Sequence, residues 1–187
     1  SESSLPEVNQ SSDDLPTIVN NDIVEVASTL PVNTQTPALI QVETDNVKMY
    51  IDSFGGDIVR VELLQHLASR DNTDSGFILM NRSSEYTYVA QSGLLGPNGT
   101  DKSASERPRF TSAQSTYVMS ESDNSLVVEL RTQQNGVNIS KRFRFERGSY
   151  LVNIDYLIEN RSNTLWRAAP YGQIRRSDFE VDSDVGI

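Results

Sequence analysis

The chain has 187 residues, a formal net charge of −10 and a hydrophobic content of 36%. This length allows one medium-sized domain with a polar tail. The acidic balance excludes proteins that bind the nucleic-acid backbone through a basic surface, so no nucleic-acid partner is expected. Because the chain has no cysteine and a single histidine, disulfide frameworks, Cys-ligated zinc and sites built from several histidines are also excluded.

The sequence contains no membrane-spanning segment of its own. No apolar run approaches the roughly 20 residues that a membrane-spanning helix needs. The chain begins at Ser1, without an initiator methionine or a signal peptide. This start leaves room for a missing N-terminal segment, such as a membrane anchor.

Residues 1–38 differ in composition from the rest of the chain. They carry six acidic residues and no Lys or Arg, and Ser, Asn, Thr, Gln and Pro fill most other positions. Low hydrophobicity with charge of one sign cannot offset the entropy cost of ordering the chain. We therefore predict a disordered acidic linker over residues 1–38 and a folded domain over residues 39–187.

The stretch from residue 42 to residue 64 gives the first clear pattern. An apolar residue occupies every second position in its first half, at Val47, Met49 and Ile51. This period is typical of a strand with one buried face. Gly55 and Gly56 then interrupt the pattern, and glycine accepts the positive φ of a tight turn. We predict a β-hairpin whose glycine corner is purely architectural.

Strand patterns continue to the end of the chain, and no convincing amphipathic helix interrupts them. Asn135-Gly136 predicts a second hairpin, and Pro170 predicts an edge or a bulge in the last strand. Residues 66–75 and 92–109 are predicted to be turn-like or irregular. Many short strands at regular spacing predict an all-β fold, an antiparallel β-sandwich or barrel-like sheet. Further strands are expected near residues 39–43, 77–80, 85–91, 125–132, 138–145, 150–160 and 165–174.

Four groups of residues could carry a function, and two of them concern acid–base chemistry. His66 would need a pocket and an orienting partner to act as a base, and a surface position at a strand end is the simpler interpretation. Three carboxylates could serve a sugar-modifying enzyme, but each lies in or beside a strand where an outward charge is expected. They are Glu129, Glu146 and Glu159.

The other two groups are basic and aromatic. Two basic runs could face anionic lipid head groups, but outward charges on strands are the simpler interpretation; they are Lys141, Arg142, Arg144 and Arg147, and Arg175 with Arg176. Aromatic residues could line a cleft, but core and cross-strand packing is favoured for Tyr86, Tyr88, Phe110, Tyr117, Phe143, Phe145, Tyr150, Tyr156, Trp166 and Tyr171. No catalytic, cofactor-binding or metal-binding residue is therefore assigned, and no cofactor is expected.

Several pieces of the sequence, taken in order, resemble the first large periplasmic domain of the YidC/Oxa/Alb family of membrane protein insertases. No single piece is specific, but the ordered set is, and it covers about residues 39–177. The pieces are VETDNVKMYIDSFGGDIVRVELL, FILM, YVAQSGLLGPNG, RPRF, KRFRFERGSYLVNIDYLIEN and YGQIRRS.

The resemblance implies a supersandwich of the galactose-mutarotase-like type on the periplasmic side of the bacterial inner membrane. It implies a non-catalytic domain of a protein that inserts and folds inner-membrane proteins, alone or with the Sec translocon. Nascent membrane proteins and Sec components would then be partners of the full-length protein, which a segment absent from this chain would anchor in the membrane. The family's insertase helices are missing here and the later strands of the sheet are expected to be missing too, so no functional residue is carried over.

One alternative remains open at this stage. A galactose-mutarotase-like sandwich could also bind carbohydrate or modify a sugar. Such enzymes use histidines together with a glutamate as acid and base, and one histidine cannot fill those roles. The sequence therefore favours a non-enzymatic domain.

Overall fold

The computed structural model describes residues 38–69 and 72–177 of the chain. The linker predicted over residues 1–38 therefore lies outside the described residues, except for Ala38. Within the described ranges the chain forms eleven strands. None of the described residues belongs to a helix long and apolar enough to cross a membrane.

The strands occupy most of the described chain. In order they are β1 (Leu39–Glu43), β2 (Val47–Asp52), β3 (Ile58–Ser69), β4 (Asn72–Arg82), β5 (Thr87–Leu95), β6 (Thr111–Ser112), β7 (Thr116–Val118), β8 (Ser125–Gln134), β9 (Val137–Glu146), β10 (Val152–Asn160) and β11 (Ala169–Arg176).

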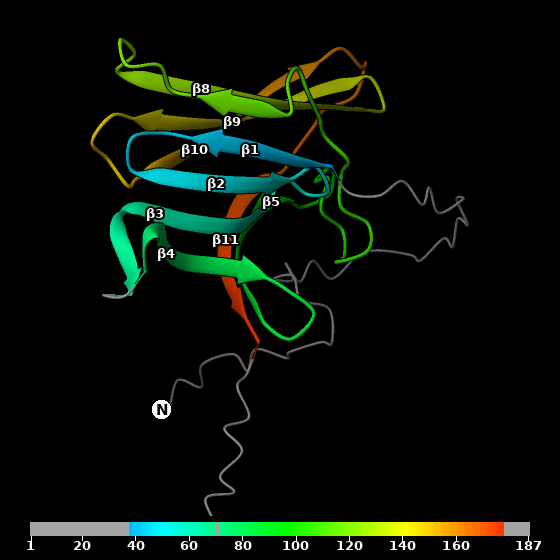
Figure 1. The fold of residues 1–187 in the computed structure, drawn as a ribbon. Helices are drawn as coiled ribbons and strands as arrows, with labels where there is room; N and C mark the ends of the chain where they lie inside the picture. The colour runs from blue at the N-terminus through cyan, green and yellow to red at the C-terminus, as the bar shows by residue number, and fades with distance from the viewer. Residues whose placement is uncertain (1–37, 70–71, 178–187) are drawn as a thin grey trace, which may run out of the picture.

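These strands form two sheets that face each other (Figure 1). The first has seven strands in the order β11-β5-β4-β3-β2-β1-β7, and the second has four in the order β10-β9-β8-β6. All pairings are antiparallel except that between β1 and β7, which is parallel. The prediction of an all-β antiparallel sandwich is therefore confirmed.

The two predicted hairpin corners have the backbone conformations that their residues favour. Gly55 and Gly56 have φ values of 74° and 65° between β2 and β3. Asn135 and Gly136 have φ values of 49° and 79° between β8 and β9, as a type I′ turn requires. Pro170 lies in β11, which is an edge strand, so its missing N–H removes no bond from the interior of the sheet.

The core lies between the two sheets and follows the period of two. Val47, Met49 and Ile51 of β2 are all buried, as their alternation predicts. The opposing sheet contributes aliphatic and aromatic side chains from β8 and β9. One cluster joins both sets, and it includes Ile40, Val42, Ile58, Val61, Leu94, Phe110, Val128, Leu130, Ile139, Phe143 and Phe145.

Two predicted loops are wrong in part. The composition of residues 66–75 predicts a turn-like stretch, but β3 continues to Ser69 and β4 begins at Asn72. Likewise β5 runs to Leu95, beyond the expected start of a loop at residue 92. Residues 92–95 pair with residues 169–172 of β11, about 75 positions further along the chain. Pairing with a distant strand therefore overrides the local preference of these residues.

Candidate functional site

Lys141 is the most unusual side chain in the core. It lies on β9, where Val137, Ile139, Phe143 and Phe145 all point inward at odd-numbered positions. Lys141 shares that register and is 0% exposed. The prediction that this lysine is an outward charge, or faces lipid head groups, is therefore wrong.

The ammonium group of Lys141 is enclosed by backbone oxygens. Its Nζ atom donates hydrogen bonds to three carbonyls, those of Gly56 at 2.8 Å, Ser92 at 2.8 Å and Gly55 at 3.0 Å. A lysine ammonium has three N–H donors, so these contacts use all of them. The bonds join β9 of the four-stranded sheet to the glycine corner and β5 of the seven-stranded sheet.

The surroundings of Lys141 alter its proton affinity. Burial lowers the pKa of Lys141 to about 7, and the positive charge of Arg107 acts in the same direction, whereas Asp57 and Asp101 oppose the change. The Nζ atom also lies 5.4 Å from the ring centroid of Phe143 and 5.7 Å from that of Tyr156. Both distances are within the range of cation–π contacts.

Arg107 lies beside Lys141 and holds two carboxylates. Its Nε atom donates to Asp101 at 2.8 Å, its Nη1 atom donates to Asp57, and its Nη2 atom donates to the carbonyl oxygens of Ser92 at 3.1 Å and Gly55 at 3.4 Å. Burial acts to lower the pKa of Arg107, but the two carboxylates raise it above the ordinary value. Arg107 is therefore a permanent cation.

Asp57, Asp101, Arg107 and Lys141 together form what we call the buried charge cluster. All four are buried, and their formal charges cancel while Lys141 is protonated. Asp101 also accepts hydrogen bonds from the backbone N–H of Leu94 at 3.0 Å and from the Thr100 hydroxyl at 2.8 Å. Buried charges are tolerated when they are paired and hydrogen-bonded in this way.

Glycine is required where the backbone approaches these side chains. A Cβ atom on Gly55 would overlap the guanidinium group of Arg107, and one on Gly93 would overlap the carboxyl group of Asp101. Gly55 also has a positive φ. The corner is thus shaped to admit the guanidinium group as well as to reverse the chain.

The buried charge cluster contains side chains of the kinds found in catalytic sites, but a substrate has no access to them. A buried lysine with a lowered pKa is typical of enzymes that use the amine as nucleophile or base. Here all three N–H groups point at backbone oxygens, and Lys141 has no exposed surface for a reacting molecule to meet. The arrangement therefore fixes the two sheets relative to each other.

The residues suggested as acids and bases do not come together. His66 is exposed, and its ring centroid lies 5.7 Å from that of Tyr150. Glu129 accepts a hydrogen bond from Arg131 at 3.0 Å, which holds the pKa of Glu129 below its ordinary value. Glu159 pairs with Arg161 at 3.1 Å.

Four of the remaining basic residues in the two runs are on the surface, whereas Arg142 is half-buried. Arg144 pairs with Asp155 at 2.5 Å, and Arg147 donates to the carbonyl oxygens of Ser120 and Asp123. Arg175 and Arg176 are exposed. The prediction of outward charges thus holds for these four residues.

The predicted role of the aromatic residues in packing is confirmed for several of them. Phe110, Phe143 and Phe145 belong to the core, and Tyr117, Tyr156 and Trp166 pack against it. Burial raises the pKa of Tyr156 and of Tyr171, so both phenols stay neutral at physiological pH.

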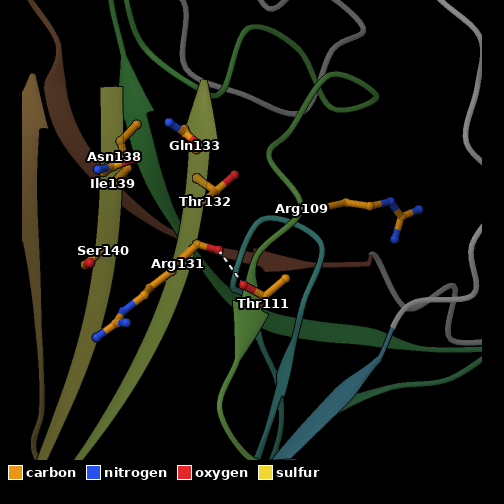
Figure 2. Close-up of a pocket in the computed structure, with 8 residues that line it drawn as sticks. All are labelled: Arg109, Thr111, Arg131, Thr132, Gln133, Asn138, Ile139 and Ser140. Carbon is orange, nitrogen blue, oxygen red and sulfur yellow. Dashed lines mark hydrogen bonds between the residues drawn. The ribbon is translucent and has the colours of Figure 1, made fainter. Parts of the chain in front are cut away.

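A surface pocket beside β8 and β9 has a cavity volume of about 370 Å³. Eight side chains line it, namely Arg109, Thr111, Arg131, Thr132, Gln133, Asn138, Ile139 and Ser140. Figure 2 shows that Arg109 and Arg131 point in opposite directions, so the two cations do not converge on one ligand. Arg109 instead lies over the ring of Phe54, at 5.4 Å from the centroid.

Metal ligands are also dispersed. In the part of the chain that the structure describes, no three His, Asp or Glu side chains gather as a metal site would require. Neither the pocket nor the buried charge cluster thus presents a reactive group to a ligand.

Comparison with known proteins relates the chain to membrane protein insertases. The family model of the YidC periplasmic domain matches residues 39–186. A protein of Cellvibrio japonicus named "Membrane protein insertase YidC" is 44% identical over 161 residues, which cover 81% of this chain and 29% of the relative. Proteins of the same name from Alcanivorax borkumensis and Stutzerimonas stutzeri are 42% and 44% identical, and the aligned parts cover 92% and 83% of this chain.

These relatives are much longer than the chain. The aligned parts make up 30% of the Alcanivorax protein and 29% of the Stutzerimonas protein, so the chain spans less than a third of each relative. The family match, in contrast, extends over nearly all of the described residues. The chain therefore belongs to the family of YidC periplasmic domains.

Proposed function

We propose that this chain is a non-catalytic periplasmic domain of a membrane protein insertase that inserts and folds proteins of the bacterial inner membrane. Its family membership over residues 39–186 is the observation that carries this proposal. The names of the relatives, all insertases, support the activity of the whole protein. The buried charge cluster is not accessible to a substrate, which supports a role in binding or scaffolding and not in catalysis.

The proposal includes an arrangement of the parent protein. Residues 1–38 are an acidic linker, residues 39–187 are part of a periplasmic β-sandwich, and segments outside this chain attach it to the membrane. The start of β1 at Leu39 and the family match from residue 39 support this division. The parent protein acts on nascent membrane proteins, alone or together with the Sec translocon.

The carbohydrate alternative has a direct test. The 187-residue chain is titrated with simple sugars by calorimetry, and interconversion of sugar anomers is followed by polarimetry. We expect neither binding nor catalysis, because the only histidine is exposed and the three candidate glutamates are dispersed. Binding at millimolar sugar or a catalysed interconversion would replace the insertase proposal with the sugar one.

The insertase activity is tested in the source bacterium. The parent gene is placed under a repressible promoter, and insertion of a small reporter membrane protein is followed by protease protection in spheroplasts. We expect the reporter to lose its inserted form on depletion and to recover it when the full-length gene is supplied. External protease should also cleave the parent protein within residues 1–38. Normal insertion after depletion would contradict the proposal.

A further inference from the structure

The chain contains two Asn-Gly pairs, Asn98-Gly99 and Asn135-Gly136. An asparagine that precedes a glycine can react with its own backbone, because glycine has no Cβ atom to keep its nitrogen away from the neighbouring side chain. The reaction needs a glycine nitrogen that has no other partner and an asparagine side chain that can turn toward it. The two pairs differ in both respects.

The Asn98-Gly99 pair is held by its neighbours. The Asn98 side chain accepts a hydrogen bond from the backbone N–H of Arg167 at 2.8 Å, and the N–H of Asn98 donates to the Arg167 carbonyl oxygen at 3.0 Å. The N–H of Gly99 donates to the carbonyl oxygen of Gly96 at 3.0 Å. Gly99 is also buried against the backbone of Leu94. The side chain and the nitrogen therefore cannot approach each other without breaking these bonds.

The Asn135-Gly136 pair has fewer restraints. Both residues are exposed at the end of the hairpin that joins β8 and β9. In the part of the chain that the structure describes, nothing hydrogen-bonds to the Asn135 side chain and nothing accepts from the N–H of Gly136. The Gly136 carbonyl oxygen accepts a bond from Arg161 at 3.0 Å, but this bond leaves the nitrogen unoccupied. A local change in the turn is thus enough to bring the two reacting groups together.

We propose that Asn135 is the site at which this chain deamidates spontaneously, with water as the only co-reactant. The Gly136 nitrogen forms a bond to the side-chain carbonyl carbon of Asn135, and the bond from that carbon to Nδ2 breaks. The released amide nitrogen takes up the proton that Gly136 loses and leaves as ammonia. Water then opens the cyclic imide at either of its carbonyls, so the product is aspartate or isoaspartate and no group is oxidised or reduced.

The modification changes the hairpin as well as its charge. Both products carry a carboxylate in place of the amide, and isoaspartate also adds a methylene group to the backbone of the turn. Gln134 and Val137 pair directly across this turn, and the register of a hairpin depends on the length of its loop. Isoaspartate at position 135 should therefore weaken the pairing of β8 with β9 at this end.

Mass spectrometry of peptides measures both sites in one sample. The 187-residue chain is incubated at mildly alkaline pH and then digested with trypsin, which gives residues 132–141 with Asn135 and residues 83–102 with Asn98. In the folded chain we expect deamidation at Asn135 to be at least about tenfold faster, because reaction at Asn98 first breaks three hydrogen bonds. Labelling by protein isoaspartyl methyltransferase measures the isoaspartate formed.

Two controls separate the effect of the fold from that of the local sequence. In guanidinium chloride the chain unfolds, and we expect similar rates at the two sites because each asparagine precedes a glycine. Asn135→Gly keeps a dipeptide that suits the type I′ turn, and it should remove nearly all isoaspartate formation in the folded chain. Near-UV circular dichroism checks that this variant folds.

The effect on the hairpin has its own comparison. Asn135→Asp has the added charge without the added methylene group. We expect the incubated chain, which contains isoaspartate, to unfold at lower urea concentration than Asn135→Asp. Equal stabilities would contradict the weakened pairing of β8 with β9.

Other results at the two sites overturn the inference. A rate at Asn135 no higher than that at Asn98 in the folded chain would show that the hairpin protects its asparagine. A difference that persists in guanidinium chloride would assign the selectivity to the local sequence and not to the fold. Isoaspartate that still forms in folded Asn135→Gly would place the reactive site elsewhere.

Discussion

The Nζ atom of Lys141 lies 2.8 Å from the carbonyl oxygen of Gly56, although the two residues are 85 positions apart in the sequence. This contact joins β9 of the four-stranded sheet to the hairpin corner between β2 and β3 of the seven-stranded sheet. Arg107 reaches the same corner through the carbonyl oxygen of Gly55. The two sheets are thus connected by buried polar contacts as well as by apolar packing.

Replacement of Lys141 by methionine should destabilise the domain. Lys141→Met keeps most of the side-chain volume but removes all three N–H donors, so the Gly56 carbonyl loses its bond to the side chain. We expect the free energy of unfolding in urea to fall by about 2 kcal/mol. Arg144→Met is the matched control on the same strand, and its exposed ion pair with Asp155 should contribute at most about 1 kcal/mol. Equal stabilities of the two variants would contradict the bridging role of Lys141.

Stability should rise with pH between about 7 and about 10. Burial lowers the pKa of Lys141 to about 7, whereas a lysine in the unfolded chain keeps its proton to about pH 10.4. Between these values the unfolded state binds more protons, so the free energy of unfolding increases with pH. Above about pH 10 the trend should reverse, because burial raises the pKa of Tyr156 and Tyr171 and unfolded tyrosines ionise first.

Urea unfolding at several pH values checks this dependence. The control is Lys141→Met, which keeps the other two lysines, Lys48 and Lys102, but should lack the rise between about pH 7 and about pH 10. A free energy of unfolding that falls over this interval, or an equal rise in the variant, would show that Lys141 is not the group responsible.

Removal of Arg107 should be more damaging than removal of Lys141. Arg107→Met leaves the carboxylates of Asp57 and Asp101 buried without their guanidinium partner, and breaking a buried pair in this way costs about 3–5 kcal/mol. Urea unfolding compares the Arg107→Met and Lys141→Met variants, and a loss of stability in Arg107→Met no larger than that in Lys141→Met would contradict this order.

Alanine substitutions at two glycines distinguish the cost of a strained backbone conformation from the cost of a steric clash. Gly55 has a φ of 74° with Arg107 in contact, whereas Gly148 has a φ of 73° and no atom within 4 Å of the point that a Cβ would occupy. Gly148→Ala should cost about 1 kcal/mol, from the left-handed conformation alone. Gly55→Ala should cost at least about 1 kcal/mol more, because Arg107 has to move. Equal losses in chemical denaturation would mean that the guanidinium contact is easily displaced.

The sequence predicts the fold better than it predicts the cluster. Alternation at Val47, Met49 and Ile51 identifies a buried strand face, and Asn135-Gly136 identifies a hairpin, because both signals are local. The course of β5 to Leu95 is not predicted, since its partner strand β11 lies far along the chain. Local signals thus define most strands but not all of their ends.

Lys141 shows why the buried charge cluster is not predicted from the sequence. The alternation of Val137, Ile139, Phe143 and Phe145 places Lys141 on the inner face, so the strand pattern does indicate that this lysine points inward. A charged residue at such a position is normally expected to point outward, because an unpaired buried charge is costly. The groups that satisfy this lysine are supplied by segments far away in the sequence, and only the folded chain brings them together.

The most direct test of a non-catalytic role is to replace Lys141 by methionine in the full-length protein and to measure the insertion activity that we propose for it. Insertion of the reporter protein is measured by protease protection in the depleted strain, at a temperature where limited proteolysis shows the variant domain to be folded. We expect insertion at the level of the unchanged protein, because the enclosed amine takes part in no reaction. Loss of insertion while the domain remains folded would contradict the account and assign a chemical role to Lys141.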